Sequence, residues 1–448
     1  MQASSPIKDK FNQMKKWIGI LACILAACAA KKLPVVHTDE ADVKQIIAAL
    51  ADDSLKGRAV FTPEIDQAAN FIAGEFAKAQ LKPLNGHTDF KQNFFVFSIQ
   101  PSMAEIIVDG VELPATNGFV LCDQTGLKWN TEPSVAIDVI KPGENFRERY
   151  QACLASKQNT LVCVSKQFKT DFIRMKAHFD AGRILLDRKQ LQQRSLVFIL
   201  TDDIPQSFRI NYTGLIREER LTNVVGVLPG KSRPNEYVVF SAHYDHIGVL
   251  DAVGQDSIAN GADDDASGVT AVISLAKIFA KQRQNERTLI FAAFTAEESG
   301  GFGSQYFSKQ LDPVKVVAML NIEMIGKDAK FGPHSLYITG FDKSDVGQIL
   351  QRNTRRTGFS FHADPYPEQN LFYRSDNATL AALGVPAHSV STVQIDQDNY
   401  YHTVDDELET LDIKNIVSAI HAIALGARTI INGEDTPSRI VPTSRSTE

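Results

Sequence analysis

Short apolar runs alternate with segments of helical spacing along the second half of the chain, and this alternation constrains the fold most. Alternation of this kind predicts parallel strands joined by crossover helices. We therefore expect an α/β fold with a doubly wound, mostly parallel mixed sheet flanked by helices. The expected strands are residues 237–241, 288–294, 316–322, 336–339 and 387–390, and the expected helices are residues 266–280, 304–311, 345–356 and 411–431.

The remainder of the 448 residues divides into further segments. Two helices at 39–51 and 64–80 lie in an N-terminal segment, residues 39–89, that we expect to pack on the sheet domain. Residues 90–217 contain short β-rich runs and no cluster of His, Asp and Glu at ligand spacing, which predicts an inserted domain that shapes or shields a site. The catalytic domain is expected at 218–434, followed by a frayed tail at 435–448 that is rich in Pro, Ser and Thr.

The first 27 residues have the pattern of an export signal. Four lysines accompany an apolar run from Trp17 to Ala27, which is too short to span a bilayer. The run ends in Leu-Ala-Ala-Cys28, which resembles the lipobox of bacterial lipoproteins. This resemblance implies lipidation of Cys28, a tether at 28–38 and a place in the cell envelope. Ala29 and Ala30 favour the outer membrane over the inner one, and an ordinary cleaved signal or a signal anchor is the alternative.

Charge and cysteine content exclude some classes of function. The chain has 47 basic and 53 acidic residues, so no overall positive surface exists to bind nucleic acid. Beyond the signal and Cys28 it holds only Cys122, Cys153 and Cys163, with no C-x-x-C pair, which gives no sign of a thiolate metal site. A Cys153–Cys163 disulfide and three buried thiols both remain open.

Polar side chains follow the predicted strands where those strands end. They are His243, Asp245 and His246 after the first strand, Glu297 and Glu298 after the second, and Glu323 after the third; Asp263, Asp264 and Asp265 precede the first crossover helix. The carboxyl ends of parallel strands lie at one edge of a sheet, where such folds bind ligands. Taken singly, each residue has an ordinary interpretation: a helix cap, a solvated loop charge or, for His246, a surface imidazole.

Four carboxylates at one edge repel one another strongly in a partly desolvated cleft, so the sequence predicts a cation there. His and carboxylate ligands without thiolate favour Zn²⁺, with Mn²⁺ or Co²⁺ as substitutes. Two zinc ions, three carboxylate ligands and a bridging hydroxide come close to neutrality and leave one carboxylate as a base. No G-x-S-x-G or H-E-x-x-H motif is present, so water is the expected nucleophile.

These motifs, in this order, resemble the co-catalytic di-zinc aminopeptidases of the secreted bacterial leucyl aminopeptidase and aminopeptidase Y/S type. The resemblance covers residues 222–431 well and 52–83 loosely, and some relatives carry a protease-associated domain in place of the insertion. It implies peptide substrates and Glu297 as general base. The implied ligands are His243 and Glu323 for one zinc, Asp263 as the bridge, followed by a cis peptide, and Glu298 and His402 for the other, with Asp245 orienting His243.

Two departures from the family pattern stand out. The family usually has Asp where this chain has Glu323, and Ser-Asp-His where it has Ser375-Asp376-Asn377. Either Tyr401 or Tyr373 is a candidate donor to the developing oxyanion, although packed tyrosines explain both.

Three other functions are compatible with the same scaffold. A carboxypeptidase needs a cation facing the substrate carboxylate, for which Arg58 and Arg374 are candidates. Glutaminyl cyclases share the fold and use one zinc, and some relatives are receptor-like binding ectodomains without catalysis. The intact ligand set favours the aminopeptidase. The sequence makes no prediction of oligomeric state.

Overall fold

The computed structural model describes residues 37–132 and 134–441. The predicted signal segment, the lipidation site Cys28 and most of the predicted tether lie outside these residues. Within the described ranges, every helix is too short or too polar to cross a bilayer.

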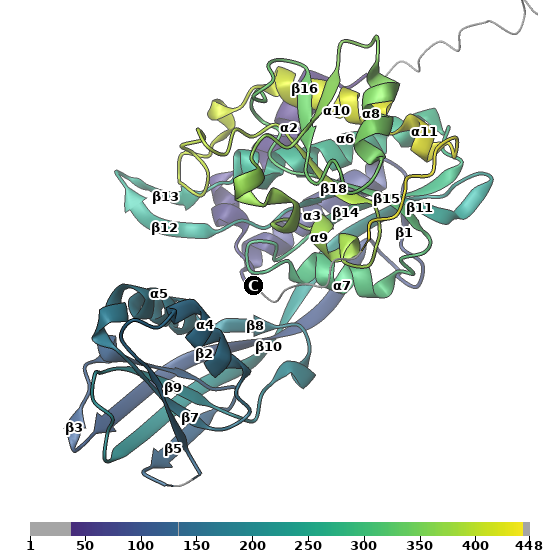
Figure 1. The fold of residues 1–448 in the computed structure, drawn as a ribbon. Coiled ribbons are helices and arrows are strands. Elements are labelled where there is room, and N and C mark those ends of the chain that lie inside the picture. The colour runs from purple at the N-terminus through teal and green to yellow at the C-terminus, as the bar shows by residue number, and fades with distance from the viewer. Residues whose placement is uncertain (1–36, 133, 442–448) are drawn as a thin grey trace, which may run out of the picture. The chain divides into compact units, whose positions relative to one another are not determined.

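The central sheet is mixed, and its middle is parallel (Figure 1). Strands β18, β15, β11 and β14 are parallel neighbours, and antiparallel partners flank them on both sides. The predicted α/β class with a mostly parallel mixed sheet is confirmed for this core. In spatial order the strands are β17 (Ser360–Ala363), β16 (Ser335–Ile338), β18 (Ala387–Ser391), β15 (Val316–Ile322), β11 (Arg233–His243), β14 (Arg287–Phe294), β10 (Phe208–Leu228), β2 (Lys91–Val108) and β3 (Val111–Glu112).

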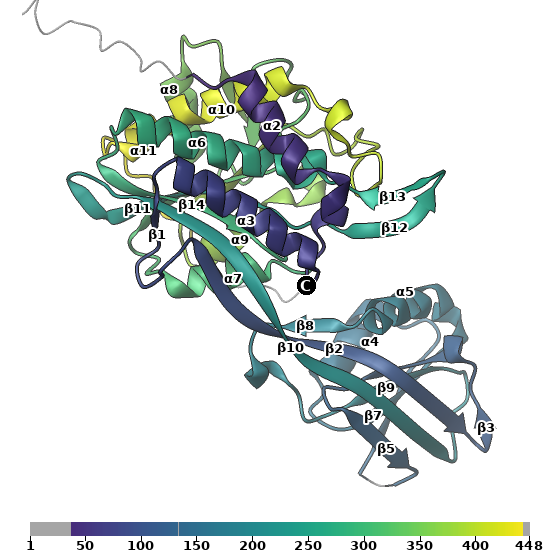
Figure 2. The same ribbon diagram turned by 180° about the vertical axis from the view of Figure 1, so that it is seen from behind.

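Helices cover both faces of this sheet. Figure 2 shows α2 (Glu40–Leu50), α3 (Pro63–Lys78) and α6 (Gly268–Gln282) over one face, and Figure 1 shows α7 (Phe302–Gln310) and α9 (Asn377–Ala381) over the other. The remaining helices of this part are α8 (Val346–Thr354), α10 (Ile413–Gly426) and α11 (Arg428–Ile431). Each predicted strand and helix of residues 237–431 has a counterpart here, and the last predicted helix is divided into α10 and α11.

The core strands are buried on both faces, which explains the long apolar runs of β14 and β15. Every residue of β14, β15 and β18 is buried. Helix α6 is also buried over most of its length, because it lies between the sheet and the N-terminal helices α2 and α3. The ends of β11, β14 and β15 are therefore held rigidly, and so are the polar residues that follow them.

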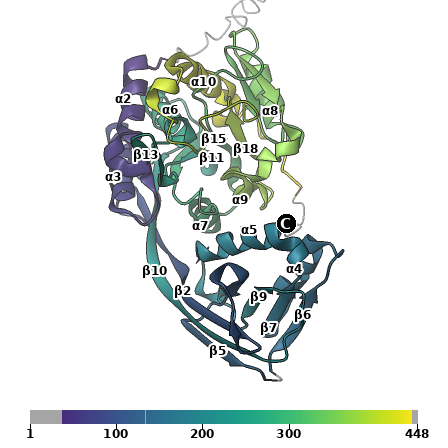
Figure 3. The ribbon, with the colours of Figure 1, turned by 90° about the vertical axis from the view of Figure 1, so that its left-hand side faces the viewer.

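The inserted segment is built on two long strands. Strands β2 and β10 pair with each other along almost their whole lengths (Figure 3), and the C-terminal part of β10 also pairs with β14 (Figure 2). The insertion thus continues strands of the central sheet, without a break at the predicted limits of 90 and 217. Short strands β1 (Lys82–Pro83), β5 (Gly126–Asn130) and β8 (Arg183–Leu185) pair with these two.

A second sheet gives the insertion its own core. Its order is β4 (Gly118–Leu121), β9 (Leu196–Leu200), β7 (Thr160–Val164) and β6 (Ala136–Ile140). Helices α4 (Phe146–Ala155) and α5 (Lys169–Asp180) bury aromatic side chains against it. The insertion is therefore a mixed α/β unit, whereas the sequence predicted only its strands.

Two further predictions are settled by packing. The predicted frayed tail is wrong for residues 435–441, because Ile440 is buried in the main core and Arg287 donates to the carbonyl of Asp435. Cys122, Cys153 and Cys163 are buried free thiols, so there is no Cys153–Cys163 disulfide.

Candidate dinuclear metal site

The polar residues that follow the core strands lie together, as predicted. His243 is the last residue of β11, Glu297 and Glu298 follow β14, and Glu323 directly follows β15. Asp264 lies just before α6. The loop after β18 contributes His402. Along the chain, the hairpin of β12 (Gly248–Val253) and β13 (Asp256–Ala259) separates His246 from the aspartates.

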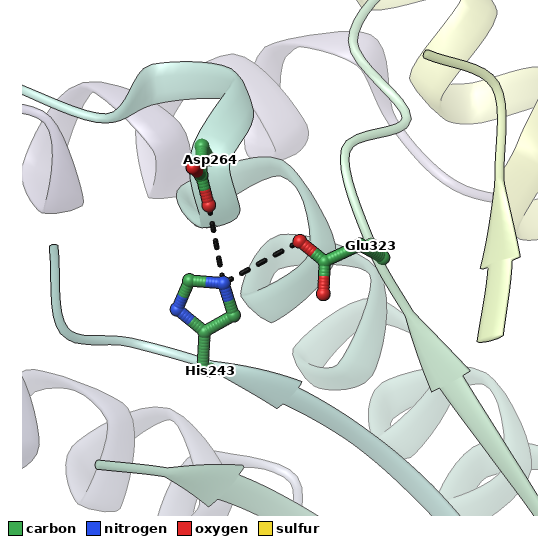
Figure 4. Close-up of side chains that lie close together, drawn as sticks. All are labelled: His243, Asp264 and Glu323. Atoms are coloured by element: carbon green, nitrogen blue, oxygen red, sulfur yellow. Dashed lines mark ion pairs between the residues drawn. The ribbon is translucent and has the colours of Figure 1, made fainter. Parts of the chain in front are cut away.

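A first group of potential ligands consists of His243, Asp264 and Glu323 (Figure 4). Nε2 of His243 lies 3.1 Å from Oδ1 of Asp264 and 3.4 Å from Oε1 of Glu323. The side chains of His243 and Asp264 are almost completely buried, and that of Glu323 is 19% exposed. This group is therefore accessible from the side of Glu323.

A second group consists of Asp264, Glu298 and two histidines. Nε2 of His402 lies 3.1 Å from Oε2 of Glu298 and 3.3 Å from Oδ2 of Asp264. Nδ1 of His246 lies 2.9 Å from the other oxygen of Glu298, Oε1, at hydrogen-bonding distance. The two groups share Asp264, which presents one carboxylate oxygen to each.

The interpretation of His246 as a surface imidazole is wrong, because this residue is 2% exposed. Its ring holds the oxygen of Glu298 that faces away from His402. The signal for this position was the second His of the His-Tyr-Asp-His segment.

The structure places Asp264, and not the predicted bridging residue Asp263, in both groups of potential ligands. Asp263 lies in neither ligand group. Its Oδ1 accepts a hydrogen bond from the backbone N–H of Gly326 at 2.7 Å, and its Oδ2 lies 3.1 Å from Nζ of Lys327. Asp263 is thus already satisfied by protein donors. The cis peptide bond joins Asp264 to Asp265, one position later than predicted.

The third aspartate of the run, Asp265, has another role. It accepts backbone N–H groups from His243, Gly268 and Met324 at 3.0 to 3.3 Å. These contacts join the ends of β11 and β15 to the start of α6. The three consecutive aspartates therefore point in three directions, and only Asp264 faces the histidines.

The predicted role of Asp245 is also corrected. Nδ1 of His243 lies 3.0 Å from the backbone carbonyl of Asp245, whereas the Asp245 carboxylate is 3.8 Å away. That carboxylate accepts the backbone N–H groups of Glu297 and Glu298 at 3.1 and 3.3 Å. Burial raises its pKa to about 6. Asp245 therefore orients His243 through its carbonyl and positions Glu297 and Glu298 through its side chain.

Glu297, the predicted general base, lines the same pocket as His243, Asp264, Glu298 and Glu323. Burial raises the pKa of its carboxyl well above the ordinary value, and the nearby carboxylates of Asp376, Glu323 and Glu298 act in the same direction. A carboxylate in such surroundings accepts a proton readily.

Glu323, which stands where the family has Asp, is supported by a chain of hydrogen bonds. Ser375 donates to its Oε2 at 2.6 Å, and Nδ2 of Asn321 donates to Ser375 at 2.8 Å. Ser241 in turn donates to Oδ1 of Asn321 at 2.7 Å. The longer side chain is thereby fixed with its Oε1 toward His243. Ser375 thus has a clear contact with the site, which the sequence did not establish.

The arginines proposed for a carboxypeptidase lie in different environments. Arg58 is completely buried, and its guanidinium donates only to backbone carbonyls, so it does not face a substrate. Arg374 lines the pocket beside Tyr401, Leu371, Val393 and Ile395. Tyr373 lines a different pocket, together with Lys343.

The donor atoms fit a pair of zinc ions. The Nε2 atom of His402 is buried and close to two carboxylate oxygens, yet it has no hydrogen-bond partner among the described residues. A buried imidazole nitrogen that lies between carboxylate oxygens without a hydrogen bond is placed as a metal ligand would be. Imidazole and carboxylate ligands without thiolate suit zinc.

Comparison with known proteins identifies the domain. Residues 223–426 match the model of peptidase family M28. This stretch, just under half of the chain, is similar to M28 peptidases. The predicted resemblance to this group of peptidases is therefore confirmed, and the matched residues include every member of the two ligand groups.

Individual relatives match only part of the chain. A probable zinc metalloprotease from Pyricularia oryzae is 32% identical over 151 residues, which are 32% of this chain and 30% of that protein. Leucine aminopeptidase 1 from Leptosphaeria maculans is 28% identical over 212 residues, 44% of this chain and 52% of that protein. The chain thus spans about half or less of these two relatives.

Solved structures share the fold over nearly the whole chain. An aminopeptidase from Aneurinibacillus sp. strain AM-1 aligns with a TM-score of 0.56 at 17% identity, covering 91% of this chain and 96% of its own. A zinc aminopeptidase from Bacillus subtilis also gives 0.56, at 15% identity, covering 91% and 99%. Both show the same mixed α/β fold.

Proposed function

We propose that the protein is a zinc-dependent aminopeptidase that removes N-terminal residues from peptides. The observation that carries this proposal is the pair of ligand groups that share Asp264 beside the half-buried Glu297. The names of its relatives, which include zinc metalloprotease and leucine aminopeptidase, support the same assignment.

In this proposal each ligand group holds one zinc ion. His243, Asp264 and Glu323 hold the first, and Asp264, Glu298 and His402 hold the second. His246 hydrogen-bonds Oε1 of Glu298 and so keeps Oε2 toward His402. Mn²⁺ and Co²⁺ are possible substitutes. When bound, such ions lower the pKa of water and polarise the carbonyl of the scissile peptide.

Glu297 is the proposed general base and acid. Its carboxylate takes a proton from the attacking water and then returns it to the departing amine. Two features of the chain suit it for this role: its pKa is raised, and Asp245 fixes the backbone from which it projects. Glu298, anchored by the same carboxylate, is positioned independently by His246.

The pocket beside the ligand groups supports an apolar N-terminal residue as substrate. Leu371, Val393 and Ile395 line it close to His243 and Glu323. Apolar walls with a few polar groups are typical of small-molecule sites. Arg374 is the cation of this pocket and is a candidate for contacts with the carbonyls of the bound peptide.

For location, we propose export and lipid anchoring through Cys28 in a bacterial cell envelope. The lipobox-like sequence and the short apolar run before it support this proposal. Palmitate labelling of the intact chain and of a Cys28→Ala variant tests it, since the variant should lose the label.

Hydrolysis of aminoacyl arylamides and short peptides, with and without a chelator, tests the proposed activity. We expect release of the N-terminal residue that stops on chelation and returns with zinc. Pyroglutamate formation from N-terminal Gln with one bound zinc would indicate a glutaminyl cyclase. Absence of hydrolysis after zinc loading, together with tight binding of a protein partner, would indicate a receptor-like ectodomain.

A further inference from the structure

Lys327 forms a buried bridge that the proposed chemistry does not use. Its Nζ lies 3.1 Å from Oδ2 of Asp263 and 2.9 Å from Oδ2 of Asp398. The side chains of these aspartates are 0% and 2% exposed, and that of Lys327 is 22% exposed. The ammonium also lies 5.1 Å from the centre of the Tyr400 ring. One cation thus compensates two buried carboxylates and contacts an aromatic face.

The residues of this bridge come from three chain segments that each carry a proposed zinc ligand. Asp263 directly precedes Asp264, Asp398 lies four residues before His402, and Lys327 itself lies four residues after Glu323. Lys327 therefore connects the chain next to all three ligands.

Lys327 and Asp398 are each held in place by a further hydrogen bond. The carbonyl of Lys327 accepts a hydrogen bond from Nδ2 of Asn415 in α10 at 2.7 Å. Oδ1 of Asp398 accepts the backbone N–H of Tyr400 at 2.8 Å, so the carboxylate that binds Lys327 also shapes the turn leading to His402. These contacts connect α10, through Lys327 and Asp398, to the turn that leads to His402.

The His402 loop depends on such an anchor more than the other segments do. The ligands at the ends of β11 and β15 are fixed by the sheet, whereas residues 392–407 form no helix or strand. The side chain of His402 is also the most exposed in the two groups, at 36%. After His402 the loop is anchored by Asp406, whose carboxylate accepts the backbone N–H groups of Asp263 and Asp264, so the Lys327–Asp398 pair is the anchor on the side that precedes His402.

We propose that Lys327 is a positioning residue that holds the His402 loop against the Asp264 loop and so completes the second zinc site. This inference rests on the proposed two-zinc function. The charge of Lys327 also neutralises Asp263, which keeps that carboxylate away from the ligand groups and leaves Asp264 as the bridge. Removal of partners behind the direct ligands commonly weakens metal binding by about 10- to 100-fold.

Zinc affinity of purified variants, measured by competition with a chromophoric chelator, tests the proposal. In Lys327→Met we expect one of two zinc ions to bind about 10- to 100-fold more weakly. Asp398→Asn, which leaves the Lys327–Asp263 pair intact, should weaken the same zinc. Lys327→Arg should restore part of the affinity. Lys330→Met is the matched control, because Lys330 is exposed and contacts Tyr366 instead.

The outcomes separate this inference from the proposed function. Wild-type protein that binds no zinc would contradict the function itself. Wild-type protein with two zinc ions, together with Lys327→Met and Asp398→Asn variants that bind both ions within twofold of wild type, would overturn the positioning role alone. Equal weakening in the Lys330→Met control would also overturn it, because the effect would not depend on the bridge. Thermal unfolding of the zinc-free variants shows whether each is folded.

Discussion

Arg58 provides the most demanding test of how the N-terminal segment supports the site. Its guanidinium donates to the carbonyl of Tyr244 at 2.8 Å, to those of Leu50 and Asn260 at 2.5 Å, and to that of Gly261 at 2.9 Å. Tyr244 directly follows His243, and Gly261 is three residues before Asp264. One side chain therefore joins the two loops that carry these ligands.

The expected cost of replacing Arg58 by Met follows from these four contacts. A hydrogen bond to a charged group contributes about 1.5–3 kcal/mol, but burying the guanidinium offsets part of the sum. Its loss leaves four carbonyls without this donor in a site where Arg58 is 0% exposed. We expect the free energy of unfolding to fall by about 3–5 kcal/mol. The free energy of unfolding of Arg58→Lys should lie between those of wild type and Arg58→Met, since one ammonium cannot reach all four carbonyls.

Urea unfolding of the zinc-free protein is the appropriate assay, because bound zinc would add its own stabilisation. Arg147→Met is the matched control, since Arg147 is exposed on α4 and should change stability by less than about 0.5 kcal/mol. A loss below about 1 kcal/mol in Arg58→Met would refute the reasoning, because four charged hydrogen bonds in a buried site cannot be removed at so small a cost.

Three further predictions concern the site and the core. Glu297→Gln should keep its zinc and lower kcat by about 10²- to 10⁴-fold, because only the proton acceptor is lost; arylamide kinetics and metal analysis check both points, and substantial remaining activity would contradict its role. Asp264→Asn should lose both zinc ions on dialysis, whereas Asp263→Asn should retain the zinc next to His243 and Glu323 and weaken at most the second one, and the reverse result would restore Asp263 as the bridge. Burial lowers the pKa of His388 from the ordinary 6.5 to about 4, so between these pH values the unfolded chain binds a proton that the native protein does not. Zinc-free wild type should therefore lose about 2 kcal/mol more stability between pH 7 and pH 5 than His388→Gln, and equal losses in urea unfolding would contradict this.

Periodicity predicted the central sheet domain well because its strands and helices are long and buried. The runs at 288–294 and 316–322 are apolar except for Thr288 and Asn321, and β14 and β15 have nearly the same limits. Strand ends then predicted where His243, Glu298 and Glu323 meet, since parallel strands place their carboxyl ends at one edge.

Periodicity could not predict in which direction each side chain of the aspartate run points. Residues 263–265 lie in an irregular turn, in which Asp264 and Asp265 have non-helical backbone angles. A period of 2 or 3.6 residues applies to strands and helices, so in this turn it does not indicate which carboxylate faces the histidines. The signal that distinguishes Asp263 is a distant one, the pairing with Lys327, which lies 64 residues further along the chain.

The helices of the insertion were missed for a related reason. Helix α4 buries only Cys153 completely, and α5 only Phe172 and Phe179, so neither has a clear apolar stripe. The continuity of β2 with β10 depends on pairing between residues more than 100 positions apart, such as Ile106 with Ile210. The sequence around one strand does not indicate which distant strand pairs with it.

Anomalous diffraction at the zinc absorption edge, from crystals of protein purified without chelator, tests the central claim most directly. We predict two peaks on either side of Asp264, one next to His243 and Glu323 and the other next to Glu298 and His402. A single peak, or peaks coordinated by Asp263 in place of Asp264, would contradict the account.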